Sequence, residues 1–154
     1  MIKVMFVCHG NICRSPMAEI VLRDMLEREG MSAEVSVASS ATSTEELGNP
    51  IYPPARAELL RRGYVLDDKK RSVQLQKSDY DRYDLFVCMD RNNLRNMGRI
   101  FGEDKQGKMH MLMDYTEQGG EVADPWFTGH FDVTYEDVRR GCEGLVAHLK
   151  KIMS

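Results

Sequence analysis

A cysteine and an arginine near the start of the chain form a pattern that could do chemistry on an anion. Cys8 is followed six residues later by Arg14. An arginine guanidinium can hold two oxygens of a phosphate in a bidentate fork. A cysteine thiolate beneath a phosphate held in this way would be a nucleophile directed at phosphorus. The spacing alone is weak support, so the residues around the pair decide its meaning.

Those residues predict a short loop between a strand and a helix. The apolar run 4–7 is typical of a strand that is buried on both faces. Gly10 and Asn11 are residue types that tolerate left-handed backbone angles, as a closed ring of backbone N–H groups requires. Ser15 is placed to cap the following helix, and Pro16 suits its first turn. Such a loop would surround an anion with N–H groups and favour the thiolate form of the cysteine.

The rest of the chain alternates between predicted strands and predicted helices. Further strands are expected at 34–38, 85–89 and 109–113, with helices at 15–29, 55–62, 92–101 and 134–152. This alternation predicts a parallel sheet with helices on both faces. Ligands bind such folds beyond the carboxyl ends of the strands. The loop after the first strand and the long loop at 114–132 are therefore the candidate site.

The composition is ordinary for a globular protein. The chain has 154 residues and a mass of 17.6 kDa, with 42% hydrophobic and 29% charged residues. One domain spanning residues 1–154 is expected, because a chain of this length can bury roughly 70% of its unfolded surface. Collagen-like, low-complexity and disordered classes are excluded. A net charge of −3 gives no reason to expect nucleic acid as a partner. No segment approaches the ~20 apolar residues of a membrane span, so no membrane partner is expected.

The four cysteines show no spacing that is typical of a metal or disulfide framework. Cys8 and Cys13 are five residues apart, and no C-x-x-C occurs. Cys88 falls on a predicted strand and Cys142 on the apolar face of the last helix, so both are expected in the core. The first residues lack the long apolar stretch and small-residue cleavage site of a secretory signal. We therefore expect a cytoplasmic protein with reduced thiols, no metal and no cofactor.

Four segments, in order, resemble the low-molecular-weight protein tyrosine phosphatases over nearly the whole chain. They are the loop VCHGNICRSPMAE at 7–19, SSATS with GNP at 39–50, CMD with NL at 88–94, and Asp124-Pro125 followed by two aromatic residues and Gly129. The resemblance implies an α/β fold with three layers and a four-stranded parallel sheet of flavodoxin-like topology. It also implies a metal-free, two-step hydrolysis of phosphotyrosine in proteins or peptides.

The resemblance gives three residues catalytic roles. Cys8 would be the nucleophile that forms a phosphocysteine, and Arg14 would bind the phosphate and stabilise the transition state. Asp124 would protonate the leaving phenol and then act as a base for the attacking water. Residue chemistry supports these roles, since a phenolate leaving group gains from a positioned carboxyl and phosphoryl transfer depends mainly on charge stabilisation. Pro125 would stiffen the loop that carries the acid.

The resemblance also implies supporting and substrate-binding residues. Ser15 would donate a hydrogen bond to the departing thiolate, and Asn11 and Ser39 would hold the loop in shape. Trp126 and Phe127 stand where many members carry tyrosines, and their rings can wall the pocket and stack on a phenyl ring. Phosphate and other oxyanions are expected to inhibit. The residues expected to contact the substrate are His9, Gly10, Asn11, Ile12, Cys13, Ser15, Trp126 and Phe127.

The chain departs from the family pattern in places. Glu45 stands near where many members carry an aromatic residue on the opposite wall. The stretch 68–72 has no histidine, although many members carry one there that braces the phosphate loop. Cys13 follows the nucleophile as in members whose second cysteine traps the oxidised nucleophile in a reversible disulfide. This arrangement predicts redox regulation.

Three alternative functions remain open from the sequence. An arsenate reductase uses a similar loop but needs two further redox cysteines on a mobile segment, which Cys88 on a buried strand fits poorly. A protein arginine phosphatase resembles a loop with threonine at the position of Ile12, so Ile12 favours tyrosine. A phosphate-binding module without activity has no need for a nucleophile, an arginine and an acid together.

Overall fold

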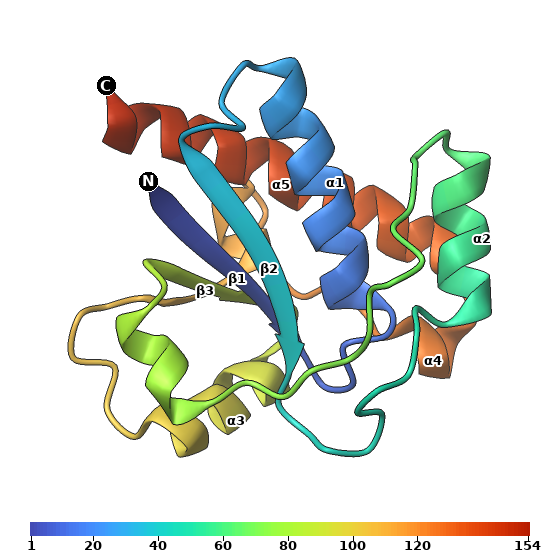
Figure 1. Ribbon diagram of the computed structural model, residues 1–154, viewed down its shortest axis with the longest axis horizontal. Helices are drawn as coiled ribbons and strands as arrows, with labels where there is room; N and C mark the ends of the chain where they lie inside the picture. Colours follow the sequence, from blue (N-terminus) through green and yellow to red (C-terminus); the bar gives the residue numbers. More distant parts are fainter.

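The structure, a computed structural model, describes residues 1–154 and is built on a sheet of four parallel strands (Figure 1). The strands follow the order β2-β1-β3-β4 across the sheet. Their bounds are β1 Ile2–Cys8, β2 Val35–Ala41, β3 Leu85–Cys88 and β4 Met109–Met111. The predicted α/β fold with a four-stranded parallel sheet is confirmed.

Helices cover both faces of this sheet, as predicted. The helices are α1 Arg14–Arg28, α2 Pro53–Arg61, α3 Arg91–Phe101, α4 Pro125–Thr128 and α5 Phe131–Met153, with 3-10 turns η1 Lys77–Asp81 and η2 Leu112–Tyr115. In Figure 1, α1, α5 and α2 lie together on one side of the sheet and α3 lies on the other. No helix combines the length and the apolar character needed to cross a membrane.

Two apolar clusters, one on each face, hold the layers together. The larger cluster joins β1 to the inner faces of α1 and α5 through residues such as Phe6, Leu22 and Leu145. The smaller one joins the opposite face of the sheet to α3 through residues such as Phe86 and Met97. Because β1 is central and covered on both faces, its residues from 4 to 8 are all buried. This explains the nearly continuous apolar run.

The strand order changes direction at β1, and this places the site. β1 is followed through α1 by β2 on one side, whereas β3 pairs with β1 on the other side. Val7 is in register with Cys88, so the loops after β1 and β3 leave the same edge of the sheet. A crevice at the carboxyl ends of strands where the order reverses is the usual ligand site of such sheets.

Several predicted boundaries are wrong, each for a local reason. β2 continues to Ala41, so 39–41 belongs to a strand that pairs along β1 and not to a loop. The strand predicted at 109–113 ends at Met111, because 112–115 turns into η2. The predicted loop 114–132 contains the end of η2, the whole of α4 and the start of α5. The last helix begins at Phe131, three residues earlier than predicted.

Candidate active site

The loop after β1 wraps its backbone around the sulfur of Cys8. β1 ends at this cysteine and α1 begins at Arg14, so the loop consists of residues 9–13. The side chain lies at the base of the loop, and the residue is 3% exposed. The backbone N–H of Asn11 donates to Cys8 Sγ at 3.3 Å, and Ser15 Oγ lies 3.0 Å from the same sulfur. A backbone amide and a hydroxyl are thus directed at the predicted nucleophile.

Asn11 carries the left-handed backbone of the loop. Its φ of 58° is the one positive φ of a non-glycine residue in the chain, as predicted for this position. The same prediction for Gly10 is wrong, because Gly10 has no positive φ. A Cβ at Gly10 would meet Glu46 Cγ at 3.3 Å, so glycine serves here for a close approach. The Asn11 side chain donates from Nδ2 to Ser39 Oγ at 2.9 Å.

The prediction that Ser15 caps α1 is wrong. The helix begins one residue earlier, with Cys13 at the cap position and no side-chain cap. Ser15 Oγ accepts from Asn11 Nδ2 at 2.8 Å and contacts the sulfur of Cys8. Ser15 therefore lies inside the first turn and not at the position from which a side chain caps the helix. Pro16 lies in the first turn as predicted, where its missing N–H costs no hydrogen bond.

Arg14 is held by three partners from distant parts of the chain. Its Nη1 donates to Asp90 Oδ2 at 2.7 Å and to the carbonyl of Val122 at 2.9 Å, and its Nη2 lies 3.5 Å from Asp124 Oδ2. Only 3% of the side chain is exposed. Burial alone would lower the pKa of Arg14, but the charges of Cys8 and the two aspartates outweigh it and raise the pKa. The guanidinium is therefore a fixed cation beside the sulfur.

Asp124 is both a helix cap and a wall of the site. Its Oδ1 accepts from the backbone N–H of Trp126 at 3.1 Å and so begins the four-residue helix α4, with Pro125 in the first position. Its other carboxylate oxygen faces Arg14. One short helix thus orients the carboxylate and places two aromatic rings beside it.

The predicted residues meet in a cavity of about 160 Å³. His9, on one rim, pairs with Glu45 at 3.0 Å. Trp126 also lines the cavity, and the centroid of its ring lies 4.8 Å from that of Tyr52. Of the predicted residues, Asn11, Ser15 and Ser39 do not line the cavity. The cavity is lined by Cys8, His9, Gly10, Ile12, Cys13, Arg14, Glu45, Glu46, Asp124, Trp126 and Phe127.

Asp90 is a supporting residue to which sequence analysis gave no role. It caps α3 by accepting from the backbone N–H of Asn93 at 2.7 Å and uses its other oxygen for Arg14. The signal was available, because an aspartate three residues before an asparagine after a buried strand is a capping pattern. Nothing in that pattern pointed to Arg14.

Lys70 and Glu19 were also missed, and they lie behind the loop. Lys70 Nζ donates to Asn11 Oδ1 at 3.1 Å, in the stretch where no histidine was found. Glu19 Oε1 accepts from Ser39 Oγ at 2.5 Å. Ser72 Oγ donates to the backbone carbonyl of Gly10 at 2.8 Å and so holds the loop at that residue.

The other cysteines are buried thiols. Burial raises the pKa of Cys13 to about 12, with smaller contributions from Cys8 and Asp124, so it is protonated at neutral pH. Burial likewise raises the pKa of Cys88 and Cys142 far above the usual range, which confirms their predicted place in the core. No group of three or more His, Cys, Asp or Glu side chains is arranged to hold a metal ion.

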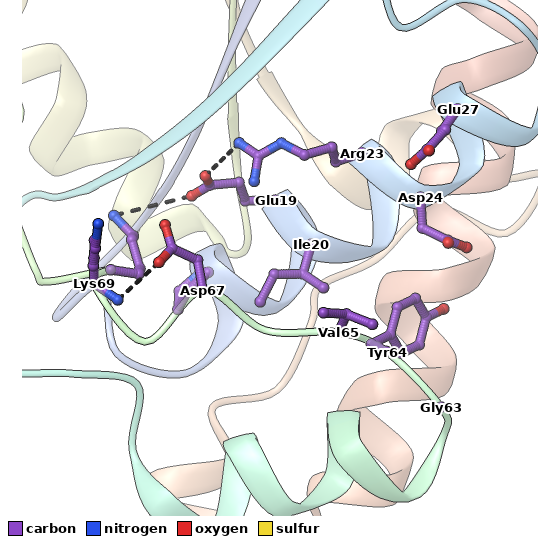
Figure 2. Close-up of a pocket in the computed structure, with 12 residues that line it drawn as sticks. Glu19, Ile20, Arg23, Asp24, Glu27, Gly63, Tyr64, Val65, Asp67 and Lys69 are labelled. Carbon is purple, nitrogen blue, oxygen red and sulfur yellow. Dashed lines mark hydrogen bonds and ion pairs between the residues drawn. The ribbon is translucent and has the colours of Figure 1, made fainter.

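A larger cavity, of about 400 Å³, lies outside the predicted site, between α1 and the segment 63–70. Figure 2 shows Glu19 and Arg23 on α1 directed toward it, with Asp67 and Lys69 on the opposite wall. It contains none of Cys8, Arg14 and Asp124, although Glu19 and Lys70 connect its wall to the loop.

Comparisons of sequence and of structure both find relatives that match nearly the whole chain. A family model described as low molecular weight phosphotyrosine protein phosphatase matches residues 3–154. The low molecular weight protein-tyrosine-phosphatase YfkJ of Bacillus subtilis is 34% identical over 153 residues, which cover 98% of this chain and 97% of that protein. The low molecular weight phosphotyrosine protein phosphatase of Mus musculus is 34% identical over 149 residues, covering 94% and 93%.

Solved structures show the same architecture. The crystal structure of YfkJ superposes with a TM-score of 0.96 at 33% identity and covers 100% of this chain and 98% of that one. The YwlE arginine phosphatase also superposes, with a TM-score of 0.84 at 29% identity and 97% coverage of both chains. The fold is therefore shared by a protein named as a tyrosine phosphatase and by one named as an arginine phosphatase.

Proposed function

Because the chain belongs to the low molecular weight phosphotyrosine protein phosphatase family and hydrolyses phosphotyrosine, we propose that Cys8, Arg14 and Asp124 perform the reaction. The observation that carries the proposal is that these three side chains line one cavity, with Arg14 in contact with the carboxylate. The whole chain, residues 1–154, would be one catalytic domain.

The first step transfers the phosphoryl group to sulfur. The thiolate of Cys8 attacks phosphorus, the bond from phosphorus to the tyrosine oxygen breaks, and the leaving oxygen takes a proton from Asp124. Arg14 and the loop N–H groups bind the equatorial oxygens, where charge is concentrated during transfer. Asp90 and the carbonyl of Val122 support this step by orienting the guanidinium.

The second step returns the enzyme to its starting state. The carboxylate of Asp124 accepts a proton from water, whose oxygen attacks phosphorus while the bond to sulfur breaks. The departing thiolate of Cys8 receives hydrogen bonds from the N–H of Asn11 and from Ser15. Both steps balance without a cofactor, because protons move only between substrate, water and one carboxyl group.

The substrates proposed are phosphotyrosine proteins or peptides, and phosphate and other oxyanions would compete for the same loop. Trp126 and Phe127 support an aromatic substrate, because they line the cavity and are 53% and 84% exposed. We propose a cytoplasmic protein with neither nucleic acid nor membrane as a partner, on the basis of its net charge and composition.

Substrate preference is expected to depend on Ile12, which is 7% exposed and lines the cavity. In the presence of EDTA, the protein is expected to hydrolyse a phosphotyrosine peptide far faster than a matched phosphoarginine peptide. Ile12→Thr is expected to shift the ratio of the two kcat/KM values toward phosphoarginine by about tenfold, the scale of one pocket contact. Phosphate release from both peptides measures the ratio. A wild-type protein that prefers phosphoarginine would make the arginine phosphatase the correct assignment.

We also propose that Cys13 protects Cys8 from irreversible oxidation. A peroxide would oxidise the thiolate of Cys8 to a sulfenic acid, and the Cys13 thiol would then displace water to form a disulfide. Both residues line the same cavity, and both thiols are free in the structure. Because the pKa of Cys13 is about 12, Cys13 would not compete as a nucleophile in the resting enzyme.

Peroxide treatment is expected to inactivate the wild-type protein reversibly and Cys13→Ser irreversibly. Without the second thiol, the sulfenic acid would proceed to sulfinic acid, which thiols do not reduce. Activity is measured before and after treatment with dithiothreitol. The mass of the peptide that contains the loop distinguishes the disulfide from the sulfinic acid. Full recovery of oxidised Cys13→Ser would show that the second cysteine has no protective role.

A further inference from the structure

The side-chain amide of Asn11 is held in one orientation by two groups that can only donate. Lys70 Nζ lies 3.1 Å and the backbone N of Val73 3.2 Å from Asn11 Oδ1. A lysine ammonium and a backbone N–H offer no lone pair to an amide hydrogen. The amide oxygen must therefore face Lys70 and Val73, and the NH₂ group must face the opposite side.

This orientation sets the direction of the hydrogen bonds that follow. Asn11 Nδ2 donates to Ser15 Oγ and to Ser39 Oγ. Each hydroxyl accepts this bond and keeps its single hydrogen for another partner. The hydrogen of Ser39 goes to the carboxylate of Glu19. The hydrogen of Ser15 has the sulfur of Cys8 as its partner at 3.0 Å, so the hydroxyl acts as a donor to sulfur.

Lys70 is suited to hold this arrangement. Its side chain is 20% exposed, and its Nζ also donates to the carbonyl of Ser39 at 3.3 Å and lies 3.9 Å from Glu19 Oε1. The other charged groups near it are Arg23 on α1, which pairs with Glu19 at 2.7 Å, and Cys8. Burial lowers the pKa of Lys70, and the charges of Glu19 and Cys8 oppose this effect.

We propose that Lys70 is a positioning residue that fixes the direction of this hydrogen-bond chain, so that the Ser15 hydroxyl always donates to the sulfur of Cys8. The proposal rests on the proposed role of Cys8 as nucleophile. A donor aimed at sulfur stabilises the thiolate before attack and again when the bond to phosphorus breaks. If Lys70 is replaced by an apolar side chain, the N–H of Val73 alone holds the amide oxygen of Asn11, so the amide orientation and the donation from Ser15 to sulfur are fixed less strongly.

The test measures the sulfur directly, by alkylation of Cys8 with iodoacetamide followed by mass spectrometry. At a fixed pH near neutrality, Lys70→Met is expected to slow alkylation about tenfold and to lower kcat for p-nitrophenyl phosphate by a similar factor, with little change in KM. This is the size expected from weakening one charge-assisted hydrogen bond. Lys70→Arg, which keeps a cation that can only donate, is expected to restore most of both rates.

Lys69→Met is the matched control, because Lys69 is exposed and adjacent in sequence. It is expected to behave as the wild-type protein in both assays. Thermal unfolding is followed for each variant, and Lys70→Ala replaces Lys70→Met if the latter does not fold. Alkylation of Lys70→Met at the wild-type rate would overturn the proposal. An equal loss of the alkylation rate in Lys69→Met would also overturn it. If alkylation slows as expected but Cys8→Ser retains hydrolysis, the proposed nucleophile is wrong and the positioning role still holds.

Discussion

Replacing Cys8 by serine is expected to reduce kcat for a phosphotyrosine peptide by at least about four orders of magnitude. The serine hydroxyl would occupy the same place beneath the loop, within reach of the N–H of Asn11 and of Ser15. It would remain protonated at neutral pH and would be a weak nucleophile there. Arg14 and the loop amides are unchanged, so binding of inorganic phosphate is expected to persist.

Steady-state kinetics and calorimetric titration with inorganic phosphate separate these two effects. Cys142→Ala is the matched control, since it removes a fully buried thiol from α5 outside the site and is expected to keep its activity. A Cys8→Ser protein with more than about 1% of wild-type kcat would contradict the cysteine mechanism.

Replacing Asp124 by asparagine is expected to lower kcat/KM for phenyl phosphate by about two to three orders of magnitude. A poor leaving group needs the proton that the carboxyl supplies, whereas p-nitrophenolate leaves without one. The loss is therefore expected to shrink steadily as the leaving phenol becomes more acidic. Asparagine can still accept from the N–H of Trp126, so the start of α4 is preserved and the variant isolates proton transfer.

A series of substituted phenyl phosphates gives the measurement, as the slope of log kcat/KM against leaving-group acidity. The slope is expected to steepen in Asp124→Asn and to stay unchanged in Asp132→Asn, which alters an exposed aspartate in the first turn of α5. Parallel slopes for Asp124→Asn and wild type would exclude this residue as the acid.

The phosphate loop could be predicted because its parts are contiguous. Cys8, Asn11 and Arg14 lie within seven residues between an apolar strand and a periodic helix, so local rules specify their arrangement. The two central strands followed from the same logic, since β1 and β3 each leave an apolar run in the sequence. The helix α4 could not be predicted from periodicity, because four residues contain little more than one turn.

Supporting contacts across the chain were beyond local rules. Arg14 and Asp90 are 76 residues apart, and Asn11 and Lys70 are 59 residues apart. From its sequence neighbours alone, each of these residues is expected to be a helix cap or a solvent-exposed charge. Only the folded sheet brings the partners together. Ser15 shows the reverse case, in which a local rule predicted a helix cap and tertiary partners took the hydroxyl instead.

The pairing of Trp126 with Tyr52 gives the site an optical property. The chain contains one tryptophan, and its half-exposed indole lies in the wall of the cavity above the nucleophile. All tryptophan emission therefore originates at the mouth of the site and none in the core. Ligand binding at the site can therefore be followed by the ultraviolet fluorescence of the unlabelled protein.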